Sequence, residues 1–274
     1  MTNAPDDLRH LTSSANPIVK LARQLATRRR ARYRERLFII EGTRPIATAI
    51  GHGARIQTLI IDEERRDGID PAFLVSIEER VDRTVTMPPA LFQSFTDTEH
   101  PQPVAAIVML PDSKPPTAAK SIVCLDAVRD PGNLGAILRT AVAAGVDGIA
   151  LLPGCVDPFN PKVVRASAGL VTAIPIHMYP SITEAVGASF DNQQEVVIIA
   201  ADAAGSIDYR DVHWKEPVLV VVGNEAAGLS EPSRLTVGHR VSIPMAEGVE
   251  SLNVSAATAI LLFEMRRQRS GRID

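Results

Sequence analysis

The sequence predicts two consecutive α/β domains, the second built on a mostly parallel sheet with helices on both faces. Short apolar runs of strand-like composition alternate with helix-like stretches along the chain, a pattern typical of parallel sheets covered by helices. The segment 111–120 (PDSKPPTAAK) interrupts this alternation, because it is rich in proline and has no apolar periodicity. We therefore expect a domain at residues 1–110, a linker at 111–120 and a second domain at 121–274.

The smaller N-terminal domain is expected to contain four short strands. Their apolar runs lie between Leu37 and Leu110 and read FII, TLIID, TVTM and AAIVML. Helix-like stretches separate them, with the sequences TRPIATAIGHG, PAFLVSIEERV and PPALFQSF. This alternation indicates a compact α/β unit.

The larger C-terminal domain is expected to have longer elements in the same alternation. Strands are predicted at residues 121–128, 148–152, 174–179, 196–201, 218–222 and 240–243. Helices are predicted from Asn133 and Pro161, after the capping-box pair Ser181 and Glu184, near Pro232 and from Val254. Because each of the first strands is followed by a helix, we expect the strands to run parallel.

The composition excludes several classes of protein. The chain has 274 residues, of which 45% are apolar and 22% charged, as in globular proteins. It lacks an uncharged apolar run of about eighteen residues, and its start lacks a secretory signal pattern, so we expect a cytoplasmic protein without a membrane partner. The two cysteines, Cys124 and Cys155, and the six histidines show no ligand spacing, which favours buried thiols and no metal site.

The net charge of −3 hides a concentration of basic residues. Residues 1–36 carry nine Lys and Arg against three Asp and Glu, so the rest of the chain is acidic. This run is either an arm that contacts phosphates, because each neutralised phosphate releases a counterion, or a solvated helix face. The candidate RNA contacts within it are Lys20, Arg23, Arg28, Arg29, Arg30 and Arg32.

Three polar, glycine-containing segments follow strand-like runs of the second domain. They are NLGAILRTA at 133–141, VVGNEAAGLS at 221–230 and IPMAEGVESLNVSAATAI at 243–260. Loops at the carboxyl ends of parallel strands meet at one edge of the sheet, so we expect a single pocket. The chain contains neither a P-loop nor a G-x-G-x-x-G fingerprint, which argues against an ordinary nucleotide-dependent enzyme that acts on small molecules.

The side chains of these segments have separable local roles. Asn133 is predicted to cap the helix that follows it, and Ser251 and Asn253 to cap the final helix. Arg139 lies roughly 130° from the apolar stripe of its own helix. It therefore faces away from the core, where a guanidinium can bind phosphate or steer a reacting hydroxyl. Gly223 lets the backbone approach a ligand closely.

The final helix is apolar or small around nearly its whole circumference from Val254 to Met265. Such a helix is buried on all sides. Either it packs on the sheet by one face and on a second subunit by the other, which we favour, or it is buried within its own domain. The basic residues that follow, RRQRSGR, are expected to end it in solvent.

Together, the three segments resemble the motifs of the SpoU (TrmH-type) RNA 2′-O-ribose methyltransferases of the SPOUT superfamily. The matching residues are Asn133, Gly135, Arg139, Thr140 and Ala141, then Gly223, Asn224, Glu225, Gly228 and Leu229, then Ile243, Pro244 and Met245 with Ser251 to Ser255. Upstream, FIIEGTRPIATAI, which contains Arg44, and the Pro-Gln-Pro of residues 101–103 resemble the L30e-like RNA-binding domain of the rRNA branch.

The resemblance implies a C-terminal trefoil knot that binds S-adenosylmethionine and a homodimer formed through the C-terminal domain. It also implies methylation of RNA, with 23S ribosomal RNA favoured over tRNA. A non-catalytic RNA-binding or ribosome-assembly protein on the same fold is the alternative. The implied cofactor contacts are Ala201, Gly223, Asn224, Gly228, Ile243 and Leu252.

The resemblance also assigns roles at the reacting centre. Arg139 is implied to activate the ribose 2′-hydroxyl, either as a base or by binding a phosphate and stabilising the developing alkoxide. Glu225, Ser251 and Asn253 would order the pocket, and Asn133 would hold the first loop. Arg165 is expected to touch either RNA or the carboxylate of the methyl donor.

Overall fold

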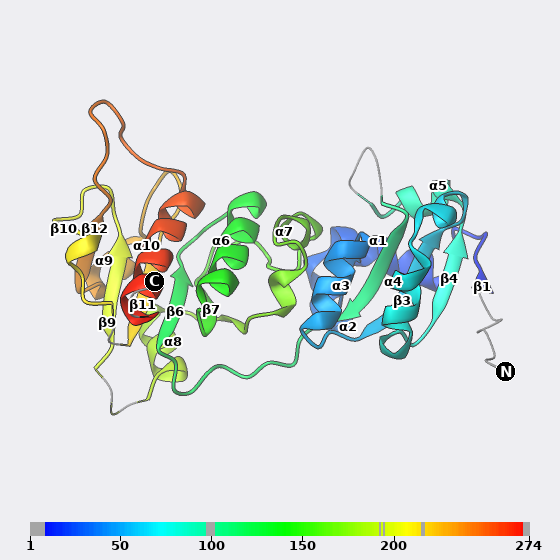
Figure 1. Ribbon diagram of the computed structural model, residues 1–274, viewed down its shortest axis with the longest axis horizontal. Coiled ribbons are helices and arrows are strands. Elements are labelled where there is room, and N and C mark those ends of the chain that lie inside the picture. The colour runs from blue at the N-terminus through cyan, green and yellow to red at the C-terminus, as the bar shows by residue number, and fades with distance from the viewer. Residues whose placement is uncertain (1–8, 97–101, 192, 194, 215–216, 271–274) are drawn as a thin grey trace. The chain divides into compact units, whose positions relative to one another are not determined.

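The chain forms two compact units (Figure 1). The computed structural model describes residues 9–96, 102–191, 193, 195–214 and 217–270. The first unit comprises Met1–Pro111 and Phe159–Ala173, and the second comprises Asp112–Pro158 and Ile174–Asp274. The segment Phe159–Ala173, which the division by sequence assigns to the C-terminal domain, is thus grouped with the first unit.

The first unit is built on a five-stranded sheet in the order β1-β4-β3-β5-β2. Strand β5 runs antiparallel to both of its neighbours, β2 and β3, whereas β4 pairs in parallel with β3 and β1. The four predicted strands are confirmed, and the two-residue β1 is an addition. The strands are β1 (Arg9–His10), β2 (Leu37–Glu41), β3 (Ile56–Asp62), β4 (Thr84–Met87) and β5 (Val104–Met109).

Short helices and 3-10 turns complete the first unit. Several begin with an Asn or Asp cap followed by proline, as at Asn16, Asp70 and Asn160, whose side chains accept a backbone N–H of the first turn. The helices are α1 (Pro17–Thr27), α2 (Arg29–Glu35), α3 (Thr43–Gly51), α4 (Pro71–Ile77), α5 (Pro89–Gln93) and α7 (Pro161–Ala166). The 3-10 turns are η1 (Glu63–Gly68), η2 (Glu78–Arg80) and η3 (Leu170–Thr172).

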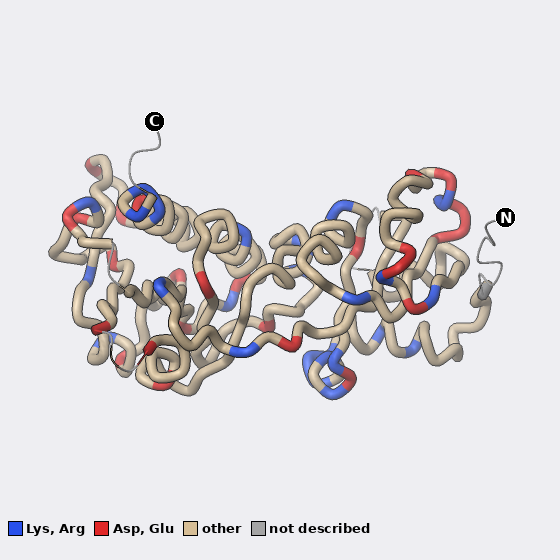
Figure 2. Tube along the Cα trace, turned by 60° about the horizontal axis from the view of Figure 1, so that its bottom comes forward, with Lys and Arg blue, Asp and Glu red and all other residues tan. Residues whose placement is uncertain are grey.

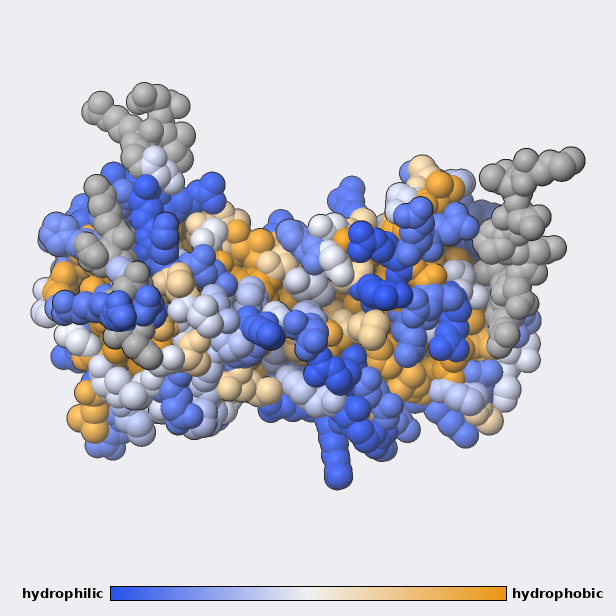
Figure 3. Space-filling model, turned by 90° about the horizontal axis from the view of Figure 1, so that it is seen from below, coloured by the Kyte–Doolittle hydropathy of each residue, from blue (hydrophilic) through white to orange (hydrophobic). Residues whose placement is uncertain are grey.

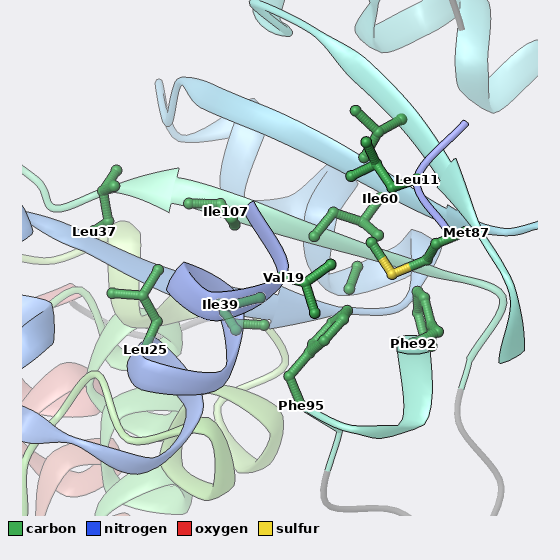
Figure 4. Close-up of a cluster of buried hydrophobic side chains, with 13 residues drawn as sticks. Leu11, Val19, Leu25, Leu37, Ile39, Ile60, Met87, Phe92, Phe95 and Ile107 are labelled. Carbon is green, nitrogen blue, oxygen red and sulfur yellow. The ribbon is translucent and has the colours of Figure 1, made fainter. Parts of the chain in front are cut away.

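The basic run near the N-terminus is part of this folded unit rather than a separate arm. Val19 and Leu25 of α1 pack in one apolar cluster with Phe92, Phe95 and side chains of the sheet (Figure 4). Of the basic residues between them, Lys20 lies on the opposite side of the helix and is exposed, whereas Arg23 is half-buried at the edge of the packed face. The run is therefore folded into packed helices with exposed basic residues, and whether these contact phosphate stays a prediction.

A close backbone approach and two ring contacts attach Phe159–Ala173 to the first unit. The ring of Phe159 lies 5.1 Å from that of Phe38 on β2 and 6.4 Å from that of Tyr33 on α2, centroid to centroid. A Cβ atom on Gly169 would lie 2.3 Å from the carbonyl oxygen of Pro45. Only glycine permits this approach, and its φ of +84° also favours glycine.

The second unit is built on a seven-stranded sheet in the order β10-β12-β9-β11-β6-β7-β8. All of the pairings described within it are parallel. The six predicted strands are confirmed, with boundaries that shift by at most three residues, and β10 is an addition. The strands are β6 (Ser121–Leu125), β7 (Gly148–Leu151), β8 (Ile176–Met178), β9 (Val197–Ala201), β10 (Ile207–Asp208), β11 (Val218–Val222) and β12 (His239–Ser242).

Helices cover the two faces of this sheet. One apolar cluster joins alternate residues of β6 and β11 to Ile182 and Ala185 of α8, and α6 and α10 pack against each other. The capping box at Ser181 is confirmed, because its Oγ accepts the N–H of Glu184. The elements are α6 (Pro131–Ala144), α8 (Ile182–Ser189), η4 (Tyr209–Asp211), α9 (Glu231–Thr236) and α10 (Val254–Ser270).

The end of α10 is only partly in solvent: Arg266, Arg267 and Ser270 are exposed as expected, Gln268 and Arg269 are half-buried, and residues 271 and 272 lie outside the described residues. Arg269 donates from Nε to the carbonyl oxygen of Trp214 and from Nη2 to that of Lys120, both at 2.8 Å. Burial lowers the pKa of the Arg269 guanidinium. Arg269 thus ties the last described turn of α10 to two backbone carbonyl groups of the second unit.

The cysteines agree with the expected burial. Cys124 on β6 is buried, Cys155 is half-buried, and both are free thiols. Desolvation raises the pKa of each thiol, so neither is a ready nucleophile. Among the described residues, no group of His, Cys, Asp and Glu has a metal-binding arrangement. Over the same residues, no helix is long and apolar enough to cross a membrane.

Candidate functional site

A cavity of about 590 Å³ opens where the loops after β9, β11 and β12 meet the start of α10. These strands are parallel, so their carboxyl ends lie at one edge of the sheet, as the sequence predicts. The volume falls within the range of roughly 300–1,000 Å³ typical of small-molecule sites. All six expected cofactor contacts line this cavity: Ala201, Gly223, Asn224, Gly228, Ile243 and Leu252.

The loop after β11 closes on itself through two glycines. The backbone of Asn224 exchanges hydrogen bonds with that of Gly228, at 2.8 and 2.9 Å. A Cβ on Gly223 would lie 2.5 Å from the carbonyl carbon of Gly228, and Gly228 itself has φ +66°. Both positions thus require glycine, one for space and the other for its backbone conformation.

The side chain of Asn224 braces the same loop. Its Oδ1 accepts the N–H groups of Ala226 and Ala227, each at 3.0 Å, and its Nδ2 donates to the carbonyl oxygen of Ala127 at 3.0 Å. Ala127 follows β6, so this asparagine ties the second motif to the neighbouring strand. The loop is therefore held in shape by the protein itself.

A chain of side-chain hydrogen bonds joins the three motifs. Asn133 donates from Nδ2 to Oε1 of Glu225 at 2.9 Å, and Asn253 donates from Nδ2 to Oδ1 of Asn133 at 2.9 Å. Oδ1 of Asn253 accepts the N–H of Ser255 at 2.9 Å, which leaves its amide nitrogen as the donor. The single pocket expected from distant segments is thus assembled by direct contacts.

The predicted capping role of Asn133 is wrong, because α6 begins two residues earlier. Asp130 is the cap: its Oδ1 accepts the N–H of Asn133 at 2.8 Å, and Pro131 occupies the first helical position. Proline fits there because its missing N–H would have no helical partner. This shift frees the Asn133 side chain for Glu225 and Asn253.

At the other end of the pocket, the expectation for the final helix is confirmed for Asn253 and wrong for Ser251, which lines the cavity and does not cap the helix. Asn253 caps α10 through its Oδ1, which accepts both the N–H and the hydroxyl of Ser255. Ser251, Asn253 and Glu225 line the cavity. The third motif thus contributes to both the helix start and the cavity wall.

Arg139 faces away from its own core, as predicted. Leu134, Ile137, Leu138 and Ala141 on the opposite stripe of α6 are fully buried, whereas Arg139 is exposed. It forms no hydrogen bond or ion pair within the part of the chain that the structure describes, and it does not line the cavity. Its guanidinium is therefore available to a partner.

Two residues of the site were missed from the sequence. Asp126 is 3% exposed and its Oδ2 accepts the N–H of Ser230 at 2.8 Å, so it anchors the end of the second motif. An acidic residue at the end of an apolar strand is the signal that could have found it. Arg234 of α9 also lines the cavity, but nothing in its local sequence distinguishes it.

The candidate RNA contacts differ in exposure. Lys20, Arg28, Arg30 and Arg44 are exposed. Arg29 is also exposed and stacks on the ring of Tyr33, 5.5 Å from its centroid. Arg23 is half-buried and donates to Oγ of Ser94 at 2.8 Å. Arg165 is exposed on α7, within the first unit.

Arg32 requires a correction. It is 3% exposed, and its Nη1 donates to the carbonyl oxygen of Leu25 at 2.6 Å. A buried guanidinium bound to a carbonyl near the end of α1 stabilises the helix pair and is not presented to RNA. Sequence alone cannot separate it from its exposed neighbours, since all belong to one basic run.

Two family models match the chain, each over one of its predicted domains. The model of the SpoU rRNA Methylase family matches residues 120–263. The model of the MRM3-like substrate binding domain matches residues 16–106.

Relatives of known name are similar over nearly the full length. The 23S rRNA (uridine(2479)-2′-O)-methyltransferase of Streptomyces viridochromogenes is 33% identical, with 89% of this chain and 88% of that protein covered. The 23S rRNA (guanosine(2553)-2′-O)-methyltransferase RlmP of Bacillus subtilis is 30% identical, with 94% of this chain and 100% of that protein covered. Among solved structures, the chain resembles the crystal structure of the SpoU methyltransferase AviRb from Streptomyces viridochromogenes in complex with AdoMet. The TM-score is 0.84 at 32% identity, and the match covers 94% of this chain and 100% of that one.

Proposed function

The chain belongs to the SpoU rRNA methylase family, and we propose that it transfers the methyl group of S-adenosylmethionine to a ribose 2′-hydroxyl of 23S ribosomal RNA. The observation that carries this proposal is the hydrogen-bonded chain Glu225–Asn133–Asn253 beside the cavity. It joins the three motifs that the reaction requires. Bacterial relatives that act on ribosomal RNA support a cytoplasmic site of action.

The residues of the cavity suit S-adenosylmethionine. Ile243, Leu252 and Leu261 would offer apolar surface to an adenine ring, and backbone groups of the Gly223 turn would hydrogen-bond its polar edge. The carboxylates of Asp202 and Glu225 complement the positive groups of the methyl donor. When bound, S-adenosylmethionine supplies a methyl sulfonium, an electrophile that needs no further activation.

The remaining task of the protein is to position and activate the ribose oxygen. Glu225 is held by the amides of Asn133 and Asn224, so the wall of the cavity is ordered before substrate arrives. Arg139 binds the phosphate beside the target ribose and stabilises the negative charge that develops on the 2′-oxygen. It does not act as the base in this proposal, because a guanidinium keeps its proton; the hydroxyl proton passes to solvent water as the methyl group is transferred.

We propose a homodimer and a trefoil knot as the setting of this site. The face of α10 opposite the buried Leu261, Leu262 and Met265 presents apolar residues, among them Phe263, which is 48% exposed. Covering it with a second subunit would also let that subunit offer its Arg139 to the cavity. The segment between β12 and α10, orange in Figure 1, returns to line the cavity, as knotting of the C-terminal part of the chain would require.

The first unit is proposed to bind RNA as an L30e-like domain. Basic segments gather on the coil of α2 in Figure 2, and hydrophilic side chains project from its region in Figure 3. Arg28, Arg29, Arg30 and Arg34 are exposed there. Such a surface suits the phosphate backbone, whose binding adds affinity without reading the sequence.

Purified protein is expected to bind S-adenosylmethionine in calorimetry and to transfer a tritiated methyl group to 23S rRNA. The acceptor nucleotide is found by mapping 2′-O-methyl groups in ribosomal RNA from a deletion strain. Transfer to tRNA alone would establish tRNA as the substrate. Absence of both binding and transfer would leave the non-catalytic RNA-binding protein as the better description.

Replacing Arg28, Arg30 and Arg34 together by glutamine is expected to weaken RNA binding and to flatten its salt dependence. Each lost phosphate contact reduces the slope of log K against log[salt] by about 0.7 to 0.9. Binding of S-adenosylmethionine should not change, since α2 does not line the cavity. The measurement is a series of RNA titrations between low and physiological salt.

The matched control removes the same charge from another face of the first unit. Arg66, Arg80 and Arg83 are exposed on or near the turns η1 and η2, and their replacement by glutamine should leave the slope near that of wild type. Equal slopes of log K against log[salt] for the two triple variants would show that the arginines of α2 act only through the net charge of the protein and make no specific phosphate contacts.

A further inference from the structure

The cavity contains one cationic side chain to which the reaction above gives no task. Arg234 is the only Lys, Arg or His among the described residues that line it. The same lining includes three carboxylates, those of Asp202, Glu225 and Glu250. A single guanidinium in such a setting indicates a ligand that carries one anionic group among cationic ones.

The hydrogen-bond donors of Arg234 are largely uncommitted. Its Nη2 lies 3.5 Å from the carbonyl oxygen of Ala227, beyond the usual range of about 2.7–3.2 Å. It forms no ion pair within the described part of the chain. The same Nη2 lies 3.6 Å from the position of a Cβ on Gly228, so the guanidinium lies beside the glycine turn of the second motif.

Polar contacts to the buried residues Ser233 and Asp126 hold the helix that carries Arg234. The neighbouring Ser233 is 4% exposed, and its hydroxyl lies 3.1 Å from that of Ser230. The N–H of Ser230 donates to the buried carboxylate of Asp126, and the N–H of Arg234 donates to the carbonyl oxygen of Ser230 at 2.9 Å. Because Asp126 directly follows β6, these two hydrogen bonds connect the backbone of Arg234 to the loop after that strand.

We propose that Arg234 binds the α-carboxylate of S-adenosylmethionine, an inference that rests on the proposed function. The methyl donor has two positive groups, the sulfonium and the α-ammonium, and one negative group, the α-carboxylate. The acidic residues of the cavity match the first two, and Arg234 is the cationic partner for the third. A guanidinium binds a carboxylate through two parallel N–H···O bonds, which fixes orientation as well as charge.

This assignment differs from the sequence-based expectation for Arg165. Arg165 lies on α7 within the first unit and is not among the described residues that line the cavity. Arg165 is exposed and keeps its expected role toward RNA.

The test compares two ligands that differ by the carboxylate alone, S-adenosylmethionine and decarboxylated S-adenosylmethionine, by calorimetry. Arg234→Gln is expected to weaken binding of the first about tenfold or more. Binding of the second should change by less than about twofold, since no carboxylate is present to be lost. Arg234→Lys keeps the positive charge but cannot form two parallel hydrogen bonds to a carboxylate. Its affinity for S-adenosylmethionine should therefore lie between those of wild type and Arg234→Gln.

Arg210→Gln is the matched control, because Arg210 is an exposed arginine of the same unit that pairs with Asp208 and does not line the cavity. It should bind both ligands as wild type does. An equal loss for both ligands in Arg234→Gln would overturn the inference in favour of an indirect effect on the loop. Unchanged affinity for both ligands would also overturn it and would indicate that Arg234 faces RNA or solvent. A wild-type protein that binds neither ligand overturns the proposed function as well, so the two failures are distinguishable.

Discussion

Arg139→Ala is expected to slow methyl transfer to RNA by a factor of about 10² to 10³, with binding of S-adenosylmethionine unchanged. Arg139 is exposed, contacts no other described side chain through a hydrogen bond, and does not line the cavity. In its proposed role, its removal would take away charge stabilisation at the reacting oxygen without breaking a described hydrogen bond. Single-turnover transfer of a tritiated methyl group, measured beside calorimetric binding of the donor, separates these two effects.

Two further variants make the Arg139 result specific. Arg139→Lys keeps a positive charge and should recover part of the rate, because a point charge still attracts phosphate. Arg210→Ala, at an exposed arginine of the same unit, should react as wild type. The free energy of unfolding of the two Arg139 variants should change by no more than about 0.5 kcal/mol. An Arg139→Ala protein that transfers the methyl group as fast as wild type would rule out the catalytic role of this arginine.

Gly223→Ala is expected to weaken binding of S-adenosylmethionine by more than about a hundredfold. The new Cβ would lie 2.5 Å from the carbonyl carbon of Gly228 and 2.7 Å from the N atom of Leu229. These are backbone atoms, so the loop must move as a whole and the paired hydrogen bonds between Asn224 and Gly228 are strained or lost. We expect the free energy of unfolding to fall by about 1–3 kcal/mol.

Gly187→Ala is the control for this substitution, because a Cβ at Gly187 would meet no atom within 4 Å. Gly187 lies inside α8, where alanine stabilises a helix by roughly 0.5–1 kcal/mol relative to glycine. The variant should be slightly more stable than wild type and should bind the donor equally well. If Gly223→Ala also bound normally, the cavity behind that turn could not be the cofactor site.

Much of the second unit follows from local patterns in the sequence. Apolar runs set its strands, and the polar segments after β11 and β12 identify the loops that line the cavity. The direction of Arg139 follows from helical periodicity alone, since Leu134, Ile137 and Leu138 define the buried stripe. These features depend on neighbours within a few residues, which is the range over which a sequence pattern can be interpreted.

The sequence by itself determined the alternation of strands and helices, the three motifs and the direction of Arg139. Only the tertiary structure decided that Arg32 is buried beneath its basic neighbours, that Phe159–Ala173 packs with the first unit, and that Arg234 lines the cavity. It also decided that Asn133 bridges Glu225 and Asn253 instead of capping its helix. The physical reason is that these roles depend on contacts between residues far apart in the chain, whereas periodicity and capping preferences report only local conformation.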